Sequence, residues 1–257
     1  MLQNQIFIYS PLEQFEVTSL LCFNSPFLGY FTLTLTNLAL YSIMILILIL
    51  GFHIMGNNKK LLPSKWSIAL ETLFASINNL VKDQIGITNE IYLPFIYSLF
   101  CFILVANLIG NIPYSFVLTS SAIFCLALSF TIFIAVTILG LYTHKIKFFS
   151  FFVPQGTPLY LVPMLVLIEL ISYSARAFSL GVRLFSNIVS GHTLVKILST
   201  FLYKAFSSSI LIAILTIFPF AIFLFICGLE IAVSTIQAYV FTILTCSYIK
   251  DAINLHG

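Results

Sequence analysis

The sequence has very little charge: Asp, Glu, Lys and Arg together make up 7% of its 257 residues. A soluble domain usually carries about 25% charged residues. A chain of this size cannot cover a water-facing surface with so few charged side chains, and 60% of its residues are hydrophobic. Most of the chain must therefore be surrounded by lipid. We expect an all-α integral membrane fold, because helices satisfy their own backbone polar groups inside a bilayer.

Several kinds of site are also missing. The five cysteines are scattered and form no CxxC pair, so buried apolar thiols are favoured over a metal or redox site. There is no P-loop or other nucleotide motif, so the isolated chain should not be an enzyme. We expect no metal ion and no cofactor. The net charge is only +3 and no basic run is present, which argues against a nucleic-acid partner. The first residues contain neither a secretory signal nor an Arg-rich transit peptide.

The uncharged stretches predict where the chain crosses the membrane. No charged residue lies between Glu16 and Lys59, and a first span fits over residues 29–55. Residues 64–82 differ, because their apolar side chains recur at helical spacing among polar ones. This pattern predicts an amphipathic helix in the membrane interface. Residues 91–142 again lack charge and are long enough for two spans.

Residues 159–249 form two further apolar stretches, separated by Ser207–Ser209. As helices, each would be roughly 60 Å long, which exceeds the hydrocarbon thickness of about 30 Å. They must therefore tilt strongly, bend or extend beyond the bilayer. We expect one membrane domain over residues 1–257, with an N-terminal segment at 1–28, about five crossings and two long antiparallel helices at the end.

The lysines predict the orientation of the chain. With five crossings, most of them fall on one side of the membrane: Lys59, Lys60, Lys65, Lys82, Lys145, Lys147 and Lys250. Lys196 and Lys204 are exceptions that flank the turn between the last two helices. The positive-inside rule then places the N-terminus outside and the C-terminus inside.

The last two stretches contain six ionisable residues: Glu169, Arg176, Arg183, His192, Glu230 and Asp251. Such residues cost from about 2.5 to above ~10 kcal/mol inside a membrane and usually face protein or a water-filled cavity. Two sets recur every seven residues, namely Glu169, Arg176, Arg183 and Ser190, and then Glu230, Gln237, Leu244 and Asp251. Seven residues are nearly two turns, so each set forms one stripe along its helix.

Antiparallel packing of these helices about a turn near Ser209 predicts three depths. Glu169 and Asp251 form an inner acidic cluster, and His192 and Glu230 form an outer protonatable pair. Arg183 and Gln237 lie between the two levels. Titratable groups at each end with an arginine between them suit a two-sided proton path, because arginine stays protonated and does not relay protons.

Structural roles remain open for each of these residues. Glu169, Gln237 and Asp251 are also suited to polar contacts between helices. His192 can simply hydrogen-bond a neighbour, and Arg183 can form a buried ion pair with a carboxylate. Arg176 suits an ion pair with Glu169 or an accessory charge as well as a direct role.

Two segments resemble the signatures of a known family, subunit a of F-type ATP synthases. Residues 179–192, SLGVRLFSNIVSGH, are similar to SLGLRLxxNxxxGH, and residues 230–244 match ExxxxxxQAYVFxxL. Residues 107–115 and 152–158 match further family motifs, and residues 10–16 look fungal. The resemblance covers nearly the whole chain. It also implies that roughly the first ten residues are a short leader that is removed.

The resemblance implies a role for each site residue. Arg183 matches the essential arginine that faces carboxylates on a ring of c subunits and blocks a direct proton leak. Glu230 and His192 match the proton inlet on the intermembrane-space side. The outlet to the matrix matches Glu169, Asp251 and His256. Asn187 and Gln237 match polar residues that flank the arginine.

The resemblance also implies a location and partners. It implies the mitochondrial inner membrane, with the N-terminus in the intermembrane space and the C-terminus in the matrix, and contacts with the peripheral stalk and other membrane subunits. Ser179 and other small residues beside Arg183 would let a rotor helix pass closely, although static helix packing fits them equally well.

Three other functions fit the sequence less well. Electron transfer of the cytochrome b type needs paired haem-ligating histidines, and only one of the four histidines lies deep in a span. A secondary transporter typically shows internal repeats, and we find none. A structural subunit of another respiratory membrane complex leaves the six ionisable residues unexplained.

Overall fold

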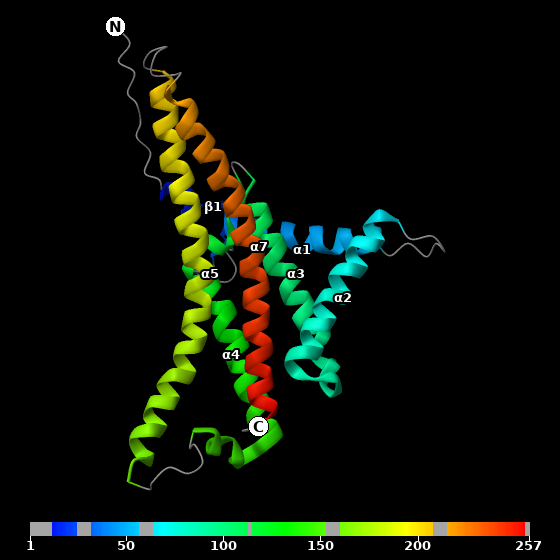
Figure 1. The fold of residues 1–257 in the computed structure, drawn as a ribbon. Coiled ribbons are helices and arrows are strands. Elements are labelled where there is room, and N and C mark those ends of the chain that lie inside the picture. The colour runs from blue at the N-terminus through cyan, green and yellow to red at the C-terminus, as the bar shows by residue number, and fades with distance from the viewer. Residues whose placement is uncertain are drawn as a thin grey trace.

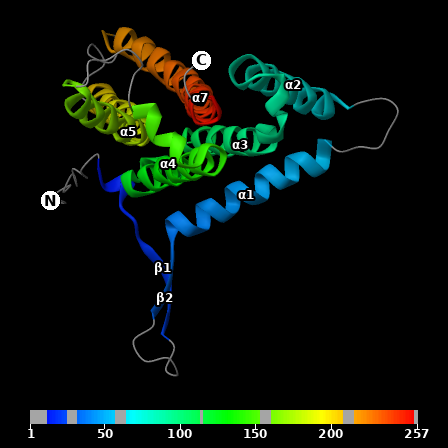
Figure 2. The ribbon, with the colours of Figure 1, turned by 90° about the horizontal axis from the view of Figure 1, so that it is seen from below.

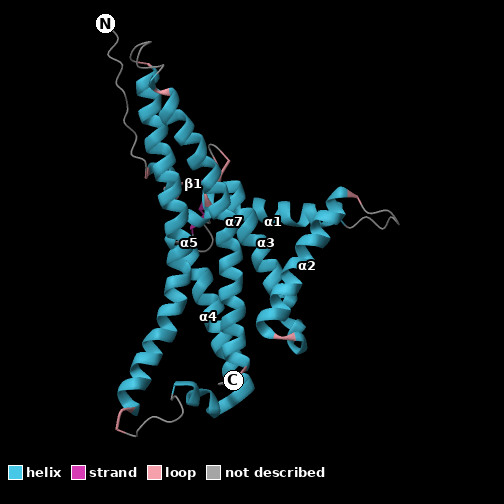
Figure 3. Cartoon of the chain, in the orientation of Figure 1, coloured by secondary structure: helices cyan, strands magenta, loops and turns pink. Residues whose placement is uncertain are grey.

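The described chain is almost entirely helical, and the predicted fold class is confirmed (Figure 3). The computed structural model describes residues 12–24, 32–56, 64–112, 115–152, 160–207 and 215–254. Five helices in these ranges are long and apolar enough to cross a membrane: α1 (Asn37–Gly56), α3 (Leu93–Gly110), α4 (Ala122–His144), α5 (Val162–Phe206) and α7 (Ile217–Ile253). Short 3₁₀ helices flank them: η1 (Glu13–Phe15), η2 (Ile87–Tyr92), η3 (Leu118–Ser120) and η4 (Lys145–Phe152).

The long helices α5 and α7 dominate the molecule. They have 45 and 37 residues, so they are about 67 and 55 Å long at about 1.5 Å per residue. They run side by side, and α4 packs against α5 while α3 packs against α7 (Figures 1 and 2). Helix α1 lies at a steep angle to both long helices in Figure 1. The long helices and α1 therefore cannot all stand along one membrane normal.

Helix α2 (Lys65–Ile85) is the sixth long helix. It begins at Ser64, whose side chain accepts a hydrogen bond from the Ser67 backbone N–H at 3.2 Å and so satisfies a helix-end donor. Its buried residues are Ile77, Leu80, Val81 and Ile85, and it contacts α1, α3 and α7. The C-terminal half of its apolar stripe is thus covered by other helices, whereas Trp66 and Phe74 are exposed.

One element departs from the expected first span over residues 29–55. Thr32–Thr36 form strand β2, which pairs antiparallel with β1 (Ser19–Asn24), and α1 begins only at Asn37. Alternating Thr and Leu in residues 32–36 give a period of two, which is typical of a strand. The Asn37 side chain then connects the start of α1 to the segment before β1 by donating to the Glu16 carbonyl at 3.1 Å.

The main core lies between α2, α3, α4, α5 and α7. Phe241, Val81 and Leu184 are fully buried there, from three different helices. Gly181 allows α4 and α5 to approach closely, because a Cβ at this position would lie 2.6 Å from the Ser129 Oγ and 2.9 Å from the Cys125 carbonyl oxygen. The core thus fixes α5 and α7 along the segment that carries the ionisable residues.

Candidate functional site

Helices α5 and α7 bring the polar residues together at three levels. Because the helices are antiparallel, residues early in α5 meet residues late in α7. Neither helix is interrupted through this segment, so the levels are set by the helical rise. From Arg176 to His192 the distance along α5 is about 24 Å, which approaches the thickness of the hydrocarbon layer.

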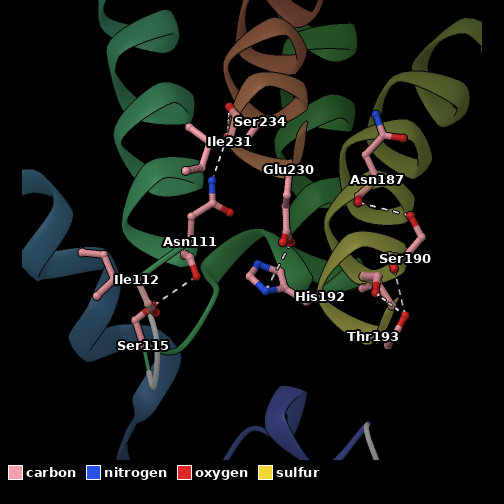
Figure 4. A network of polar contacts seen from close by, with 12 residues as sticks. Asn111, Ile112, Ser115, Asn187, Ser190, His192, Thr193, Glu230, Ile231 and Ser234 are labelled. Carbon is pink, nitrogen blue, oxygen red and sulfur yellow. Dashed lines mark hydrogen bonds and ion pairs between the residues drawn. The ribbon is translucent and has the colours of Figure 1, made fainter. Parts of the chain in front are cut away.

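The first level joins His192 of α5 and Glu230 of α7. The His192 Nδ1 lies 3.4 Å from the Glu230 Oε1, and the two side chains are 16% and 13% exposed (Figure 4). Gly191 makes room for the carboxylate, because a Cβ there would lie 2.9 Å from the same oxygen. The Phe15 ring of η1 covers His192 edge-on, with ring centroids 6.4 Å apart. Two proton-exchanging groups are therefore held together in a mostly buried place.

The second level joins Asn187 and Gln237. The Asn187 Nδ2 donates to the Gln237 Oε1 at 2.8 Å, and Gln237 is buried. Arg183 lies one helical turn before Asn187 and is exposed. It forms no hydrogen bond or ion pair with the described residues. The sequence placed Arg183 itself at the depth of Gln237, but the hydrogen bond to Gln237 comes from Asn187.

The third level contains Arg176 between two carboxylates. Its guanidinium lies 3.8 Å from the Glu169 Oε1 and donates a hydrogen bond to the Asp251 Oδ2 at 3.2 Å. All three side chains are partly exposed, between 30% and 42%. These contacts therefore support a structural role for Arg176, the ion pair with Glu169 that the sequence left open. One guanidinium opposite two carboxylates leaves this cluster with an excess negative charge when all three are ionised.

Arg183 stands in an exposed row of small residues on α5. Ser172, Ala175, Ser179, Ser186 and Ser190 are exposed at helical spacing around it. This row leaves the α5 surface beside the guanidinium free of bulky side chains. Ser179 thus lies next to Arg183 on the surface of α5 and takes no part in the buried contacts.

Sequence reasoning missed a polar contact that brings α3 to the same region. The Asn107 Nδ2 donates to the Ser234 carbonyl at 3.2 Å, and Asn111 Nδ2 donates to the Ser234 Oγ at 2.9 Å. The Thr119 hydroxyl completes the group by donating to the Asn107 Oδ1 at 3.1 Å. The available signal was two asparagines one turn apart near the end of an uncharged span.

His256, predicted for the outlet, lies outside the described residues.

Comparison with known proteins identifies the chain. The family model described as ATP synthase A chain matches residues 38–250. The chain belongs to this family. It is 66% identical over 250 residues to ATP synthase subunit a of Mycosarcoma maydis, covering 97% of this chain and 98% of that protein. It is 50% identical to ATP synthase subunit a of Emericella nidulans over 251 residues, covering 97% and 98% of the two chains.

The yeast Kluyveromyces lactis provides a further relative, an ATP synthase subunit a that is 49% identical over 255 residues, or 98% of this chain and 99% of that protein. All three relatives are fungal, as the N-terminal motif suggested. The resemblance inferred from the two C-terminal motifs is therefore confirmed. So is the expectation of a subunit of a larger complex, not an enzyme in its own right.

Proposed function

We propose that this chain is the proton-translocating stator subunit of an F-type ATP synthase in the mitochondrial inner membrane. It provides two offset aqueous half-channels to carboxylates on a ring of c subunits, and Arg183 separates them. Family membership supports the stator role. The observation that carries the finer proposal is the contrast between Arg183, exposed and without a partner among the described residues, and Arg176, held by two carboxylates.

An exposed arginine on a membrane helix needs a counter-charge or water. The described part of the chain provides Arg183 with no carboxylate, so its proposed counter-charge comes from a partner subunit. A carboxylate that passes Arg183 is favoured in its ionised form by the adjacent positive charge, so it releases its proton there. The small residues around Arg183 fit a partner helix that passes closely and moves on.

The two half-channels are proposed to end at the two ionisable clusters. His192 and Glu230 form the inlet from the intermembrane space, and Glu169 and Asp251, with His256, form the outlet to the matrix. The clusters lie at opposite ends of the shared α5–α7 segment, which supports offset channels. Passage of each proton provides about 2.3 kcal/mol per 100 mV of membrane potential. The lysine distribution supports an N-terminus in the intermembrane space and a C-terminus in the matrix.

The arginine assignment is tested in the intact complex, reconstituted into lipid vesicles. Arg183→Ala should abolish ATP synthesis driven by a proton gradient while the complex still assembles. Lys204→Ala provides a matched control, because Lys204 is an exposed cation in the last turn of the same helix. It should retain synthesis. Substantial synthesis by the Arg183→Ala complex would refute the assignment.

The inlet assignment has its own test. Glu230→Gln keeps the size of the side chain but removes the group that gives up a proton, so proton uptake and ATP synthesis should both slow. An unchanged proton flux in vesicles would count against the inlet role of Glu230 and leave the arginine assignment intact.

A further inference from the structure

Buried polar atoms without a hydrogen-bond partner gather around the first two levels. Within the described residues there are five such side-chain atoms, and four of them are the Asn111 Oδ1, His192 Nε2, Glu230 Oε1 and Gln237 Nε2. The Glu230 Oε1 has the 3.4 Å contact with the His192 Nδ1 but no hydrogen bond. The fifth belongs to Asn78 on α2. Buried polar groups are normally satisfied by protein or by ordered water. Four of them, carried by α5, α7 and the residue that follows α3, therefore indicate a place that holds water, which we call the passage.

The spacing along α7 explains why water is needed there. Glu230, Ser234 and Gln237 lie on one face, at helical spacing. Glu230 and Gln237 are about 10 Å apart along the axis, whereas one hydrogen bond spans only about 3 Å. A proton therefore cannot pass between these two levels in a single step. Any continuous path needs intermediate groups near Ser234.

Asn111 presents a free acceptor at this intermediate level. Its Nδ2 donates to the Ser234 Oγ at 2.9 Å, and the Ser234 hydroxyl itself donates to the Ile231 carbonyl at 2.8 Å. The hydroxyl hydrogen of Ser234 is thus occupied, while the Asn111 Oδ1 is buried and has no donor among the described residues. Figure 4 shows the Asn111 amide reaching from α3 towards α7, beside Glu230.

Asn107 differs from Asn111, the residue that directly follows α3, although it lies only one turn earlier in the chain. Both ends of its amide are engaged, one with the Ser234 carbonyl and the other with Thr119, and the residue is fully buried. It therefore fixes α3 against α7 at the level of Ser234. This contact places the Asn111 amide next to the passage.

We infer that Asn111 is a positioning residue of the proton inlet, whose amide oxygen holds water that continues the path from Glu230 past Ser234 towards Gln237. The inlet is then lined by three helices, α3, α5 and α7. This inference rests on the proposed inlet role of Glu230 and His192.

The test compares three variants of the intact ATP synthase in lipid vesicles. Asn111→Leu removes the amide while keeping the number and branching of the side-chain heavy atoms, and it should slow ATP synthesis about tenfold, because a water position loses its acceptor. It should also increase the solvent deuterium isotope effect, since proton delivery becomes rate-limiting. Asn111→Ser keeps a polar atom with space for water and should stay within about twofold of the natural rate. Asn78→Leu is the matched control, because the Asn78 Oδ1 on α2 is also buried without a hydrogen-bond partner but lies away from the passage, and this variant should leave the rate unchanged.

A natural rate in Asn111→Leu, or equal slowing in Asn111→Leu and Asn78→Leu, would overturn the inference. So would an Asn111→Ser complex as slow as the leucine variant. Parallel measurement of Glu230→Gln separates the two claims. If Glu230→Gln slows uptake and Asn111→Leu does not, only the role of Asn111 fails; if Glu230→Gln is also normal, the inlet itself is misassigned.

A labelling experiment covers the case in which Asn111→Leu does not assemble. Asn111→Cys is made together with Cys22→Ser and Cys227→Ser, because the other three cysteines are buried. A cationic methanethiosulfonate added on the inlet side should modify the new thiol and inhibit synthesis. Resistance to this reagent would show that water does not reach position 111 and would overturn the inference.

Discussion

Gly191→Ala should slow proton uptake by displacing the Glu230 carboxylate. An added Cβ would lie 2.9 Å from the Glu230 Oε1 and 3.3 Å from its Cδ, whereas ordinary contact begins at 3.4 Å. The carboxylate must therefore move by about 0.5 Å. Because it is the far end of a flexible side chain, it can move without unfolding either helix. The complex should therefore still assemble.

The size of the effect follows from this displacement. Misplacement of a reacting group by about 1 Å costs on the order of a hundredfold in rate, so about half of that distance predicts roughly a tenfold loss. The substitution should not weaken α5, since alanine is favoured over glycine in a helix by about 1 kcal/mol. Loss of rate with normal assembly would therefore report on the His192–Glu230 pair.

The assay is ATP synthesis by reconstituted complex at a fixed proton gradient, with the amount of assembled complex measured alongside. Gly51→Ala is the control, because Gly51 lies within α1 and a Cβ there meets no atom within 4 Å. It should leave the rate unchanged. A Gly191→Ala complex as fast as the Gly51→Ala complex would refute the claim that close packing places the Glu230 carboxylate.

Three further changes have distinct expected outcomes. Arg176→Leu leaves Asp251 without its 3.2 Å partner, so ATP synthesis should slow at the proposed outlet and Asp251→Asn in the same chain should not restore it. Asn107→Leu should lower the melting temperature of the complex, because the buried Thr119 hydroxyl loses its acceptor at a cost of about 1–3 kcal/mol. Gly181→Val should reduce the amount of assembled complex seen on native gels, since even a Cβ meets the α4 backbone at 2.9 Å.

Much of the fold could be predicted because lipid imposes simple rules on the sequence. Uncharged stretches mark the crossing helices, and the excess length of the last two already required tilt or bending. The β1–β2 hairpin was not predicted, because the absence of charge between Glu16 and Lys59 is equally compatible with a strand and with a membrane-spanning helix. The alternation of Thr and Leu at 32–36 was the local signal against a helix there.

The candidate site was less predictable, because it depends on the exact register between the two long helices α5 and α7. Helical spacing groups the residues of each helix into stripes. Pairing residues of α5 with residues of α7 at the same depth, however, assumed that the register between the two helices is constant along their length. A shift of one turn replaces Arg183 by Asn187 as the neighbour of Gln237. The α3 contribution could not be found in this way, since Asn107 and Ser234 are 127 residues apart and no local pattern connects them.

The two arginines of α5 show how the opposite helix decides what a charge can do. Arg176 and Arg183 are seven residues apart and lie on one stripe. Across from Arg176, α7 provides Asp251; seven residues earlier, the same stripe of α7 carries Leu244 instead of a carboxylate. No carboxylate of the described residues pairs with Arg183, whose guanidinium stays exposed. The same residue type therefore forms ion pairs within the chain at position 176 and none among the described residues at position 183, and this difference is what makes Arg183 the candidate for a charge outside the chain.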